Sequence, residues 1–348
     1  MTRGMGVLVA AAAFLHLATS GSQAETYRIR QLPIPTGYRS SIADALNDSG
    51  TVVGGLWDDS GDLHTAVWKP DGSVLIDPVK PEGTLGREAM GVNNLGQIAL
   101  SVSDADYMSH GILLNPDGSY LDIGSLGGGY TVPWAVNDLG QVVGRSRTAS
   151  REDCAFIWSA ATGIVDLGVP AWSYACDINN DGVVIGDSTA TGDFRWTRSG
   201  CTYFGWPNSV SAINNLGQAV GHSSVVYGDW LATVWNPDGT KRVLGPGHAS
   251  GINDLGQVVG SNEGVPMLWE PDGRTVALDV PSNYPGCEAV DINASGTIIG
   301  NNCPDGWYQA FVWEVVPEPS SVVSVGSGLL MACAFARRHN RRRSSACL

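Results

Sequence analysis

One short phrase occurs seven times along this chain, and a repeat of this kind restricts the possible folds more than any other feature. The phrase has the pattern apolar-x-[Ala/Gly/Asp]-[Ile/Val/Leu]-Asn-x-x-Gly, followed by a run rich in β-branched residues. Its asparagines are Asn47, Asn93, Asn137, Asn179, Asn214, Asn253 and Asn293. Successive asparagines are 46, 44, 42, 35, 39 and 40 residues apart. Such a period, with several short strands per unit, is typical of a propeller or an array.

Each repeat contains the apolar runs of four short strands. The phrase itself predicts two strands joined by a tight turn, in which the Asn side chain bonds the backbone and the Gly takes a left-handed conformation. A third strand ends in tryptophan in six units, and Leu114 takes that place in the second unit. These tryptophans are Trp68, Trp158, Trp196, Trp235, Trp269 and Trp313. Four units then carry a Pro-Asp-Gly turn before a fourth apolar run.

Four antiparallel strands in each of seven units, without helical periodicity, predict an all-β, seven-bladed β-propeller. The seventh unit lacks a fourth strand, and the segment Thr26–Leu32 resembles the strand that is missing. We therefore expect the N-terminal strand to close the ring, which leaves no exposed sheet edge there. The repeated tryptophans are expected to lie in the core between blades.

The first 24 residues resemble a secretory signal peptide. Arg3 precedes an apolar run from Val7 to Ala18, and small residues near Ala24 suit cleavage. The alternative, an uncleaved anchor, is disfavoured because the run is short for a membrane span. The propeller is then expected to occupy residues 25–315.

Residues 316–348 form a tail in three parts. VPEPSS comes first, a short apolar stretch covers residues 322–336, and five arginines follow between Arg337 and Arg343. This order resembles the PEP-CTERM sorting signal of exported bacterial proteins. The resemblance implies that an exosortase recognises Pro317, Glu318 and Pro319 and removes the tail after transient anchoring in the inner membrane. A permanent C-terminal anchor is the alternative.

The repeats resemble the extracellular HAF repeat family, which is named for a His-Ala-Phe motif. The motif is degenerate here, for example Cys154-Ala155-Phe156 and Gln309-Ala310-Phe311. The resemblance covers nearly all of residues 43–313 and brings no established activity with it.

Charge and cysteines suit an exported protein. The net charge of the whole chain is −14, which disfavours nucleic acid and anionic lipid as partners and permits cations or neutral glycans. We expect a disulfide between Cys287 and Cys303, which flank one hairpin, and consider a second between Cys154 and Cys176. Cys201 is left without a partner.

Six further tryptophans fall in or beside the loops that connect the fourth strand to the next blade, or the second strand to the third. They are Trp57, Trp134, Trp172, Trp206, Trp230 and Trp307. These two kinds of loop share one face of a propeller, and loops on a rigid scaffold commonly carry function. Aromatic rings beside acids suit sugar binding, so these tryptophans are the candidate ligand-binding residues. Alternatively, they only pack the loops onto the ring.

Neither a cofactor site nor a catalytic motif is recognisable. Asp177, Asn179 and Asp181 have the first spacings of a calcium loop, but Ser188 stands where its closing carboxylate is required. The sequence contains neither a Gly-x-Ser-x-Gly elbow nor a phosphate-binding loop.

The leading interpretation is a non-enzymatic, exported propeller of the cell envelope or extracellular matrix that binds polysaccharide or another surface partner. A carbohydrate-active hydrolase or lyase on the same scaffold is one alternative, since such chemistry needs only two acids. A purely structural matrix protein is the other.

Overall fold

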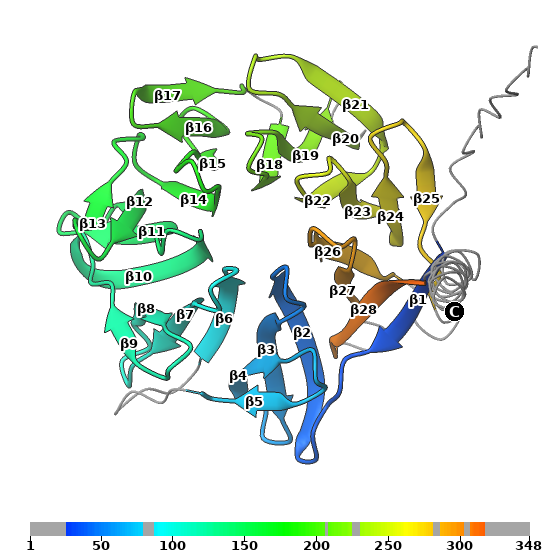
Figure 1. Ribbon diagram of the computed structural model, residues 1–348. Coiled ribbons are helices and arrows are strands. Elements are labelled where there is room, and N and C mark those ends of the chain that lie inside the picture. The colour runs from blue at the N-terminus through cyan, green and yellow to red at the C-terminus, as the bar shows by residue number, and fades with distance from the viewer. Residues whose placement is uncertain are drawn as a thin grey trace, which may run out of the picture. The chain divides into compact units, whose positions relative to one another are not determined.

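The computed structural model describes residues 26–78, 87–205, 208–224, 230–280, 286–302 and 307–316, and residues 27–316 form one compact unit. The described residues contain 28 strands in seven four-stranded antiparallel sheets, arranged around a central axis (Figure 1). The predicted seven-bladed β-propeller is therefore confirmed. Within the described residues no helix is long and apolar enough to cross a membrane. The predicted signal peptide and the sorting tail from residue 317 onward, with its apolar stretch 322–336, lie outside the described residues; Val316, assigned to the tail, is the last residue of β28.

Each blade runs from an innermost strand a to an outermost strand d. The a strands are β2 (Tyr38–Leu46), β6 (Arg87–Val92), β10 (Gly127–Val136), β14 (Ser173–Ile178), β18 (Asn208–Ile213), β22 (His248–Ile252) and β26 (Glu288–Ile292). The b strands are β3 (Val52–Asp58), β7 (Ile98–Ser103), β11 (Val142–Thr148), β15 (Val184–Ser188), β19 (Ala219–Ser224), β23 (Val258–Asn262) and β27 (Ile298–Asn302). The c strands are β4 (Leu63–Trp68), β8 (Ser109–Leu114), β12 (Asp153–Ser159), β16 (Phe194–Thr197), β20 (Trp230–Trp235), β24 (Val265–Trp269) and β28 (Gln309–Val316). The d strands are β5 (Val74–Ile76), β9 (Tyr120–Asp122), β13 (Gly163–Asp166), β17 (Gly200–Tyr203), β21 (Lys241–Pro246), β25 (Thr275–Ala277) and β1 (Thr26–Gln31).

The alternating strand direction gives the ring two different faces. The a–b and c–d turns lie on one face, which we call the Asn face because the repeated asparagines form its a–b turns. The d–a and b–c connections lie on the other face, which we call the loop face.

The seventh blade is closed by the N-terminal strand, as predicted. Its sheet has the order β1-β28-β27-β26, so β1 is the outer strand beside β28. Leu32, which follows β1, donates its backbone N–H to Ala310 O at 2.9 Å and is buried in the core between blades seven and one. The side chain of Asn301 both donates to and accepts from the backbone of Ala43 in blade one. Closure therefore combines strand pairing, apolar burial and hydrogen bonds across the joint.

The apolar core is divided into seven clusters, one at each joint between neighbouring blades. Each cluster contains or contacts one of the repeated strand-c tryptophans or, in the joint of blades one and two, Leu114. Trp313 is fully buried and donates its indole N–H to Asp279 O at 2.9 Å. The prediction that these tryptophans form the core between blades is confirmed. A buried aromatic side chain of this size contributes roughly 1.5–3 kcal/mol through the apolar area it removes from water.

Every strand a contains a β-bulge at the same place. In β2 the register passes from Ala43↔Gly54 to Ala45↔Val53, so Asp44 has no partner on β3. The other six a strands skip the equivalent residue in the same way. The glycine opposite the bulge is required in six blades, because strand a approaches it closely. A Cβ on Gly260, for example, would lie 1.9 Å from His248 O.

Candidate functional site

The tryptophans predicted for the loop face do not converge on one site. Trp57 is the last residue but one of β3, and Trp172 immediately precedes β14. Trp230 begins β20, and Trp307 lies two residues before β28. These four lie at loop-face ends of strands, as predicted. Trp134 was predicted in or beside a loop of this face, but it is the bulged residue within β10 and lines the central channel, so that assignment was wrong. Trp206 lies outside the described residues.

The first aromatic cluster lies where blades seven and one meet. The rings of Trp57 and Tyr308 are stacked, with centroids 6.0 Å apart and an interplanar angle of 22°. The neighbouring Trp307 is covered by the guanidinium of Arg39, whose Cζ lies 3.7 Å from the ring centroid. Trp307 and Tyr308 are 42% and 41% exposed, so this cluster presents ring surface to solvent.

A second cluster lies between blades three and four. Tyr174 packs edge-on against Trp134, with ring centroids 4.8 Å apart, and burial raises the pKa of its hydroxyl to about 12. Arg145 lies 5.7 Å from the Trp134 centroid and donates to the Tyr130 hydroxyl at 3.1 Å. Its Nη1 is also 3.7 Å from a carboxylate oxygen of Asp153. This cluster therefore connects the loop face to the channel wall.

A third cluster lies between blades five and six. The Nδ1 atoms of His222 and His248 are 3.1 Å apart, and the Trp230 ring lies edge-on to His222 at 4.3 Å. Burial, and then the nearby His248, lower the pKa of His222 to about 4, so this imidazole is neutral at neutral pH. Sequence analysis found Trp230 but not this histidine pair, because its two members are 26 residues apart and belong to different blades.

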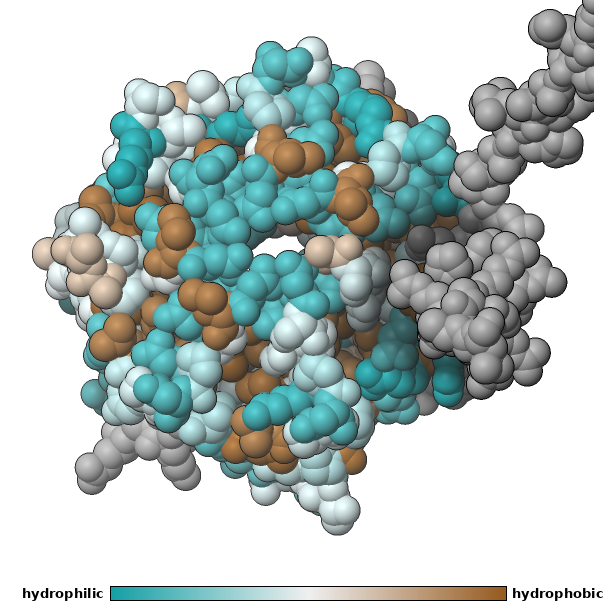
Figure 2. All heavy atoms as spheres, viewed as in Figure 1, coloured by the Kyte–Doolittle hydropathy of each residue, from teal (hydrophilic) through white to brown (hydrophobic). Residues whose placement is uncertain are grey.

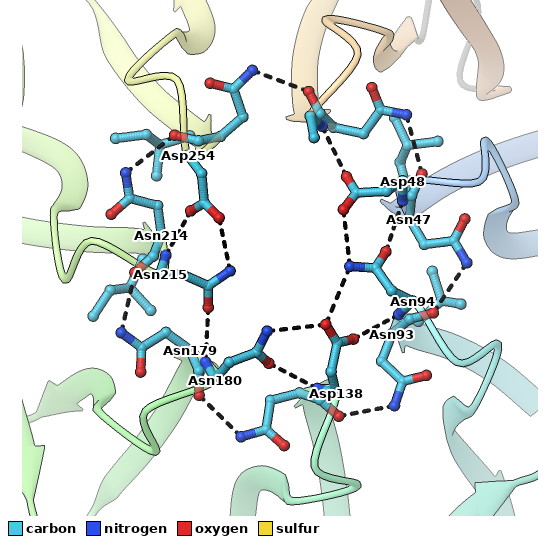
Figure 3. Close-up of a pocket in the computed structure, with 18 of the residues that line it drawn as sticks. Asn47, Asp48, Asn93, Asn94, Asp138, Asn179, Asn180, Asn214, Asn215 and Asp254 are labelled. Atoms are coloured by element: carbon cyan, nitrogen blue, oxygen red, sulfur yellow. Dashed lines mark hydrogen bonds between the residues drawn. The ribbon is translucent and has the colours of Figure 1, made fainter.

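The seven repeated asparagines form a closed ring of hydrogen bonds around the axis (Figure 3). In each blade, the side-chain Nδ2 donates to the backbone carbonyl of the Asn in the next blade, at 2.8–3.1 Å. The Oδ1 atom accepts backbone N–H groups of its own turn, as predicted. The structural role assigned to these residues is thus confirmed, while the contact between blades was not foreseen.

A second ring is formed by the residues that follow these asparagines. Six of them accept, through a side-chain oxygen, the backbone N–H of the equivalent residue in the preceding blade, at 2.7–2.9 Å. The exception is Ala294, which has no side-chain acceptor to offer to Asp254. The two rings line a cavity of about 190 Å³ at the Asn-face end of the channel. Figure 2 shows the central opening surrounded by hydrophilic residues.

A larger cavity of about 370 Å³ occupies the channel next to these rings. The two cavities are adjacent, because five apolar residues line both: Leu46, Val92, Val136, Ile213 and Ile252. All seven bulged residues line the larger cavity, and we call them the bulge belt. The bulge belt consists of Asp44, Met90, Trp134, Cys176, Ser211, Ser250 and Val290.

Three acids lie in the wall of the larger cavity: Asp44, Asp177 and Asp291. Each oxygen of Asp177 accepts a backbone N–H, from Ile178 and from Ile213 of the next blade, both at 2.8 Å. Asp291 makes the equivalent bonds to Ile292 and Leu46. Burial raises the pKa of Asp177 to about 7 and that of Asp291 to about 6.

Asp44 differs from these two acids because its Oδ2 atom is buried without a hydrogen-bond partner. Burial, and then the negative charge of Glu88, raise the pKa of Asp44 well above its usual range. The sequence did contain a signal for the bulge belt. The position three residues before each repeated Asn carries six different residue types in seven copies, whereas the positions before and after it carry three types each.

The weak calcium-like loop is an ordinary repeat turn in the structure. Asp177 is engaged with backbone N–H groups, and Asn179 belongs to the Asn ring. Oδ1 of Asn179 accepts the backbone N–H of Asp181 at 3.1 Å. Within the described residues, no group of three or more His, Cys, Asp or Glu side chains is placed to hold a metal ion.

The cysteines of the described chain are free thiols. The pairing of Cys154 with Cys176 is wrong, because the two lie within β12 and β14, and Cys176 Sγ is directed to Ile185 O at 3.4 Å and Val210 O at 3.6 Å. Burial raises the pKa of Cys154 to about 11 and that of Cys287 to about 12. Cys303 lies outside the described residues, so the structure gives its pairing with Cys287 no support.

Neither a family model nor a curated protein matches this chain. Solved structures with a similar fold include virginiamycin B lyase from Staphylococcus aureus, with a TM-score of 0.54 and 11% identity over 84% of this chain and 100% of the other. A puromycin hydrolase gives 0.52 and 14% identity, over 82% of this chain and 55% of the other. The structure of YCF48 bound to D1 peptide gives a TM-score of 0.51 and 12% identity, over 85% of this chain and 98% of the other. The likeness shows the fold alone, because one scaffold serves many functions.

Proposed function

We propose that this protein is a binding propeller of the cell envelope or extracellular matrix that recognises polysaccharide through its loop face. The observation that carries the proposal is the exposed aromatic cluster of Trp57, Trp307 and Tyr308. Flat rings of this kind stack on the apolar faces of sugars, while Arg39 and nearby acids can bond hydroxyl groups.

Two other aromatic residues of the loop face are displayed in an unusual backbone conformation. Trp172 has a φ of 60° and is 55% exposed, and Tyr107 has a φ of 59° and is 79% exposed. A left-handed conformation costs a residue with a Cβ about 1 kcal/mol or more, and such strain is concentrated at functional sites. A polymeric ligand that crosses several blades can contact such separated anchors, whereas a small ligand cannot.

The net charge of −14 favours a neutral or cationic polymer over an anionic one. The known structures with this fold include a lyase, a hydrolase and a peptide-bound protein, so the fold does not discriminate between binding and catalysis.

The direct test is affinity electrophoresis of the purified propeller through gels that contain neutral or cationic polysaccharides. Trp307→Ala and Tyr308→Ala should each weaken binding about tenfold, because each removes a stacking surface. Tyr120→Ala is the matched control, since Tyr120 is 45% exposed but lies in the outer strand β9. Equal binding by all three variants would refute a role for the loop-face aromatics.

The same preparation addresses the alternatives. Release of shortened or unsaturated sugars from a bound polysaccharide would identify a hydrolase or a lyase. Failure to retain any polysaccharide, with the fold intact, would leave the structural matrix protein as the better proposal.

We also propose that the chain is exported by residues 1–24 and sorted by the tail. Its support is the sequence order of Pro317-Glu318-Pro319, a short apolar stretch and an arginine cluster. The fifteen residues 322–336 give about 22 Å of helix, which is short for a hydrocarbon core of about 30 Å and suits temporary anchoring. Intact-mass measurement of protein from its own host should show loss of the tail near Pro317. A mass that includes Arg337–Arg343 would contradict the sorting proposal.

A further inference from the structure

The central channel has features of a ligand site that are independent of the loop face. A bulge in each innermost strand places one side chain per blade in the wall of a cavity of about 370 Å³. The Asn and the Gly of the repeat phrase occur in all seven copies, but these seven positions include an acid, a thioether, an indole, a thiol and hydroxyls. Structural needs alone do not explain this variety, because all seven blades have the same backbone geometry at this point. Cavities of this size with a few polar groups in fixed positions are typical of small-molecule sites.

The polar part of the cavity wall has one sign of charge. Its described lining includes Asp44, Asp177 and Asp291 and contains neither lysine, arginine nor histidine. Arg145 comes nearest through its contact with Trp134. Arg145 and Arg147 share the Asp153 carboxylate, at 3.7 and 3.1 Å, so this acid offsets one of their two charges. Burial is the main cause of the raised pKa values of the three acids.

Asp44 provides an independent sign of a missing partner. This acid is half-buried on the channel wall, and its Oδ2 atom is buried without a hydrogen-bond partner among the described residues. Asp177 and Asp291 hold backbone N–H groups of the next blade and so have a structural role. The Oδ2 atom of Asp44 makes no such bond with the residues that the structure describes. A buried carboxyl without a partner is costly and calls for a ligand or another explanation.

The remaining wall favours an organic cation over a metal ion. Met90, Val290 and Trp134 contribute thioether, aliphatic and aromatic surface to the same cavity. Aromatic faces and polarizable sulfur suit a cation that carries hydrocarbon. Inorganic divalent cations instead require several oxygen ligands in one shell, and the described residues offer no such cluster.

We propose that the bulge belt binds a small organic ammonium ion, with Asp44 as the anionic partner and Trp134 and Met90 as the surface for its hydrocarbon part. The ammonium group donates a hydrogen bond to the Asp44 carboxylate and supplies the positive charge that the channel lacks. The proposal does not depend on polysaccharide binding by the loop face.

The test uses the purified protein and four probes of known chemistry in isothermal titration calorimetry: n-butylammonium, choline, n-butanol and butyrate. We expect n-butylammonium to bind at least about tenfold more tightly than n-butanol, because only the former pairs with the carboxylate. Butyrate should not bind. Equal affinity for n-butylammonium and n-butanol, or failure of n-butylammonium to bind, would overturn the proposal.

Two variants locate the site. Asp44→Asn should weaken n-butylammonium binding about tenfold. Trp134→Leu keeps an apolar side chain but should weaken choline binding about fivefold through loss of the cation–π contact. Asp59→Asn is the matched control, because it removes one negative charge from an exposed residue outside the channel. If Asp44→Asn and Asp59→Asn bind n-butylammonium equally, the cation does not occupy the bulge belt.

Thermal unfolding of each variant shows whether it is folded, and Asp44→Asn should not be destabilised because it replaces an unpartnered buried acid. The two proposals can fail separately. Tyr308→Ala should leave n-butylammonium binding unchanged, and Asp44→Asn should leave polysaccharide binding unchanged.

Discussion

At the residue scale, the repeated Asn makes several hydrogen bonds with one side chain. In blade three, Asn137 Oδ1 accepts the backbone N–H groups of Leu139 and Gln141, while Nδ2 donates to the Gln141 side chain and to Asn179 O in blade four. Asn137 is only 3% exposed, so water cannot replace these partners. Neither aspartate nor serine could satisfy both the acceptors and the donors.

Replacing Asn137 with alanine should therefore lower the free energy of unfolding by about 2–4 kcal/mol, because several buried backbone groups lose their partners together. Urea unfolding followed by tryptophan fluorescence measures the change. The control is Asn94→Ala, which removes an exposed member of the second ring and should cost less than about 1 kcal/mol. Similar costs at the two sites would show that the buried hydrogen bonds of Asn137 contribute no more than the exposed ones of Asn94.

Asp193 gives a prediction about pH. It is 2% exposed, and burial, followed by the negative charge of Asp187, raises its pKa from 3.8 to about 7. The folded protein then binds this proton more strongly than the unfolded chain, so the free energy of unfolding falls as pH rises from about 4 to about 7. Asp193→Asn should make this fall shallower in urea titrations at several pH values. Asp59→Asn, at an exposed site, is the control, and an unchanged slope in Asp193→Asn would contradict the assignment.

The local role of the Asn turns could be predicted from sequence, because the Asn, the Gly and the turn lie within a few residues. The bond from Asn137 to Asn179 could not, since it depends on how two blades that are separated by 42 residues pack. Trp134 was misplaced for a related reason. A bulge shifts one residue of β10 out of register, and neither hydrophobic pattern nor turn chemistry reveals which strand positions then face the axis.

At the element scale, β1 differs from the other 27 strands in being far in sequence from its sheet. Tyr27 and Ile29 pack against the core between blades six and seven, and Leu32 is buried between blades seven and one. The missing fourth strand of the last repeat made this arrangement predictable. The exposed ion pair of Arg30 with Glu314, at 2.9 Å, adds little, because exposed ion pairs contribute about 0–1 kcal/mol.

Deletion of residues 26–32 should lower the thermal midpoint sharply, because β28 becomes an open edge and apolar contacts of two joints are lost. Differential scanning calorimetry measures the midpoint, and the synthetic peptide TYRIRQL added in excess should recover part of the loss. Arg30→Ala is the control and should shift the midpoint only slightly. An unchanged midpoint after the deletion would show that β1 does not contribute to closure.

At the scale of the whole molecule, the two faces of the ring differ in how much their residues vary from blade to blade. The Asn face repeats nearly the same turn in every blade, and its two hydrogen-bonded rings hold the blades together. The loop face and the bulge belt carry the residues that differ from blade to blade. A uniform structural face with a variable second face is what a rigid scaffold for recognition requires.

Because β1 and β28 are neighbouring antiparallel strands, the propeller can be circularly permuted by joining them. A permuted protein that joins Val316 to Thr26 through a Pro-Asp-Gly turn, with new ends within residues 79–86, should fold into the same seven blades. Its thermal midpoint should equal or exceed that of the parent, because closure of blade seven becomes covalent. Circular dichroism and calorimetry test this expectation. Loss of the fold would mean that the original chain ends are needed for more than closing the ring.

The hydrogen-bonded ring of repeated asparagines also depends on the number of blades. Each blade contributes one amide donor and one carbonyl acceptor, and the seventh donor, Asn293, finds the carbonyl of the first blade at Asn47. Any open row of blades would keep one unused donor at one end and one unused acceptor at the other. Fragments of this protein therefore carry complementary ends. In a protein designed from copies of one blade, pairing of the terminal donor with the terminal acceptor would show that the number of copies closes the ring.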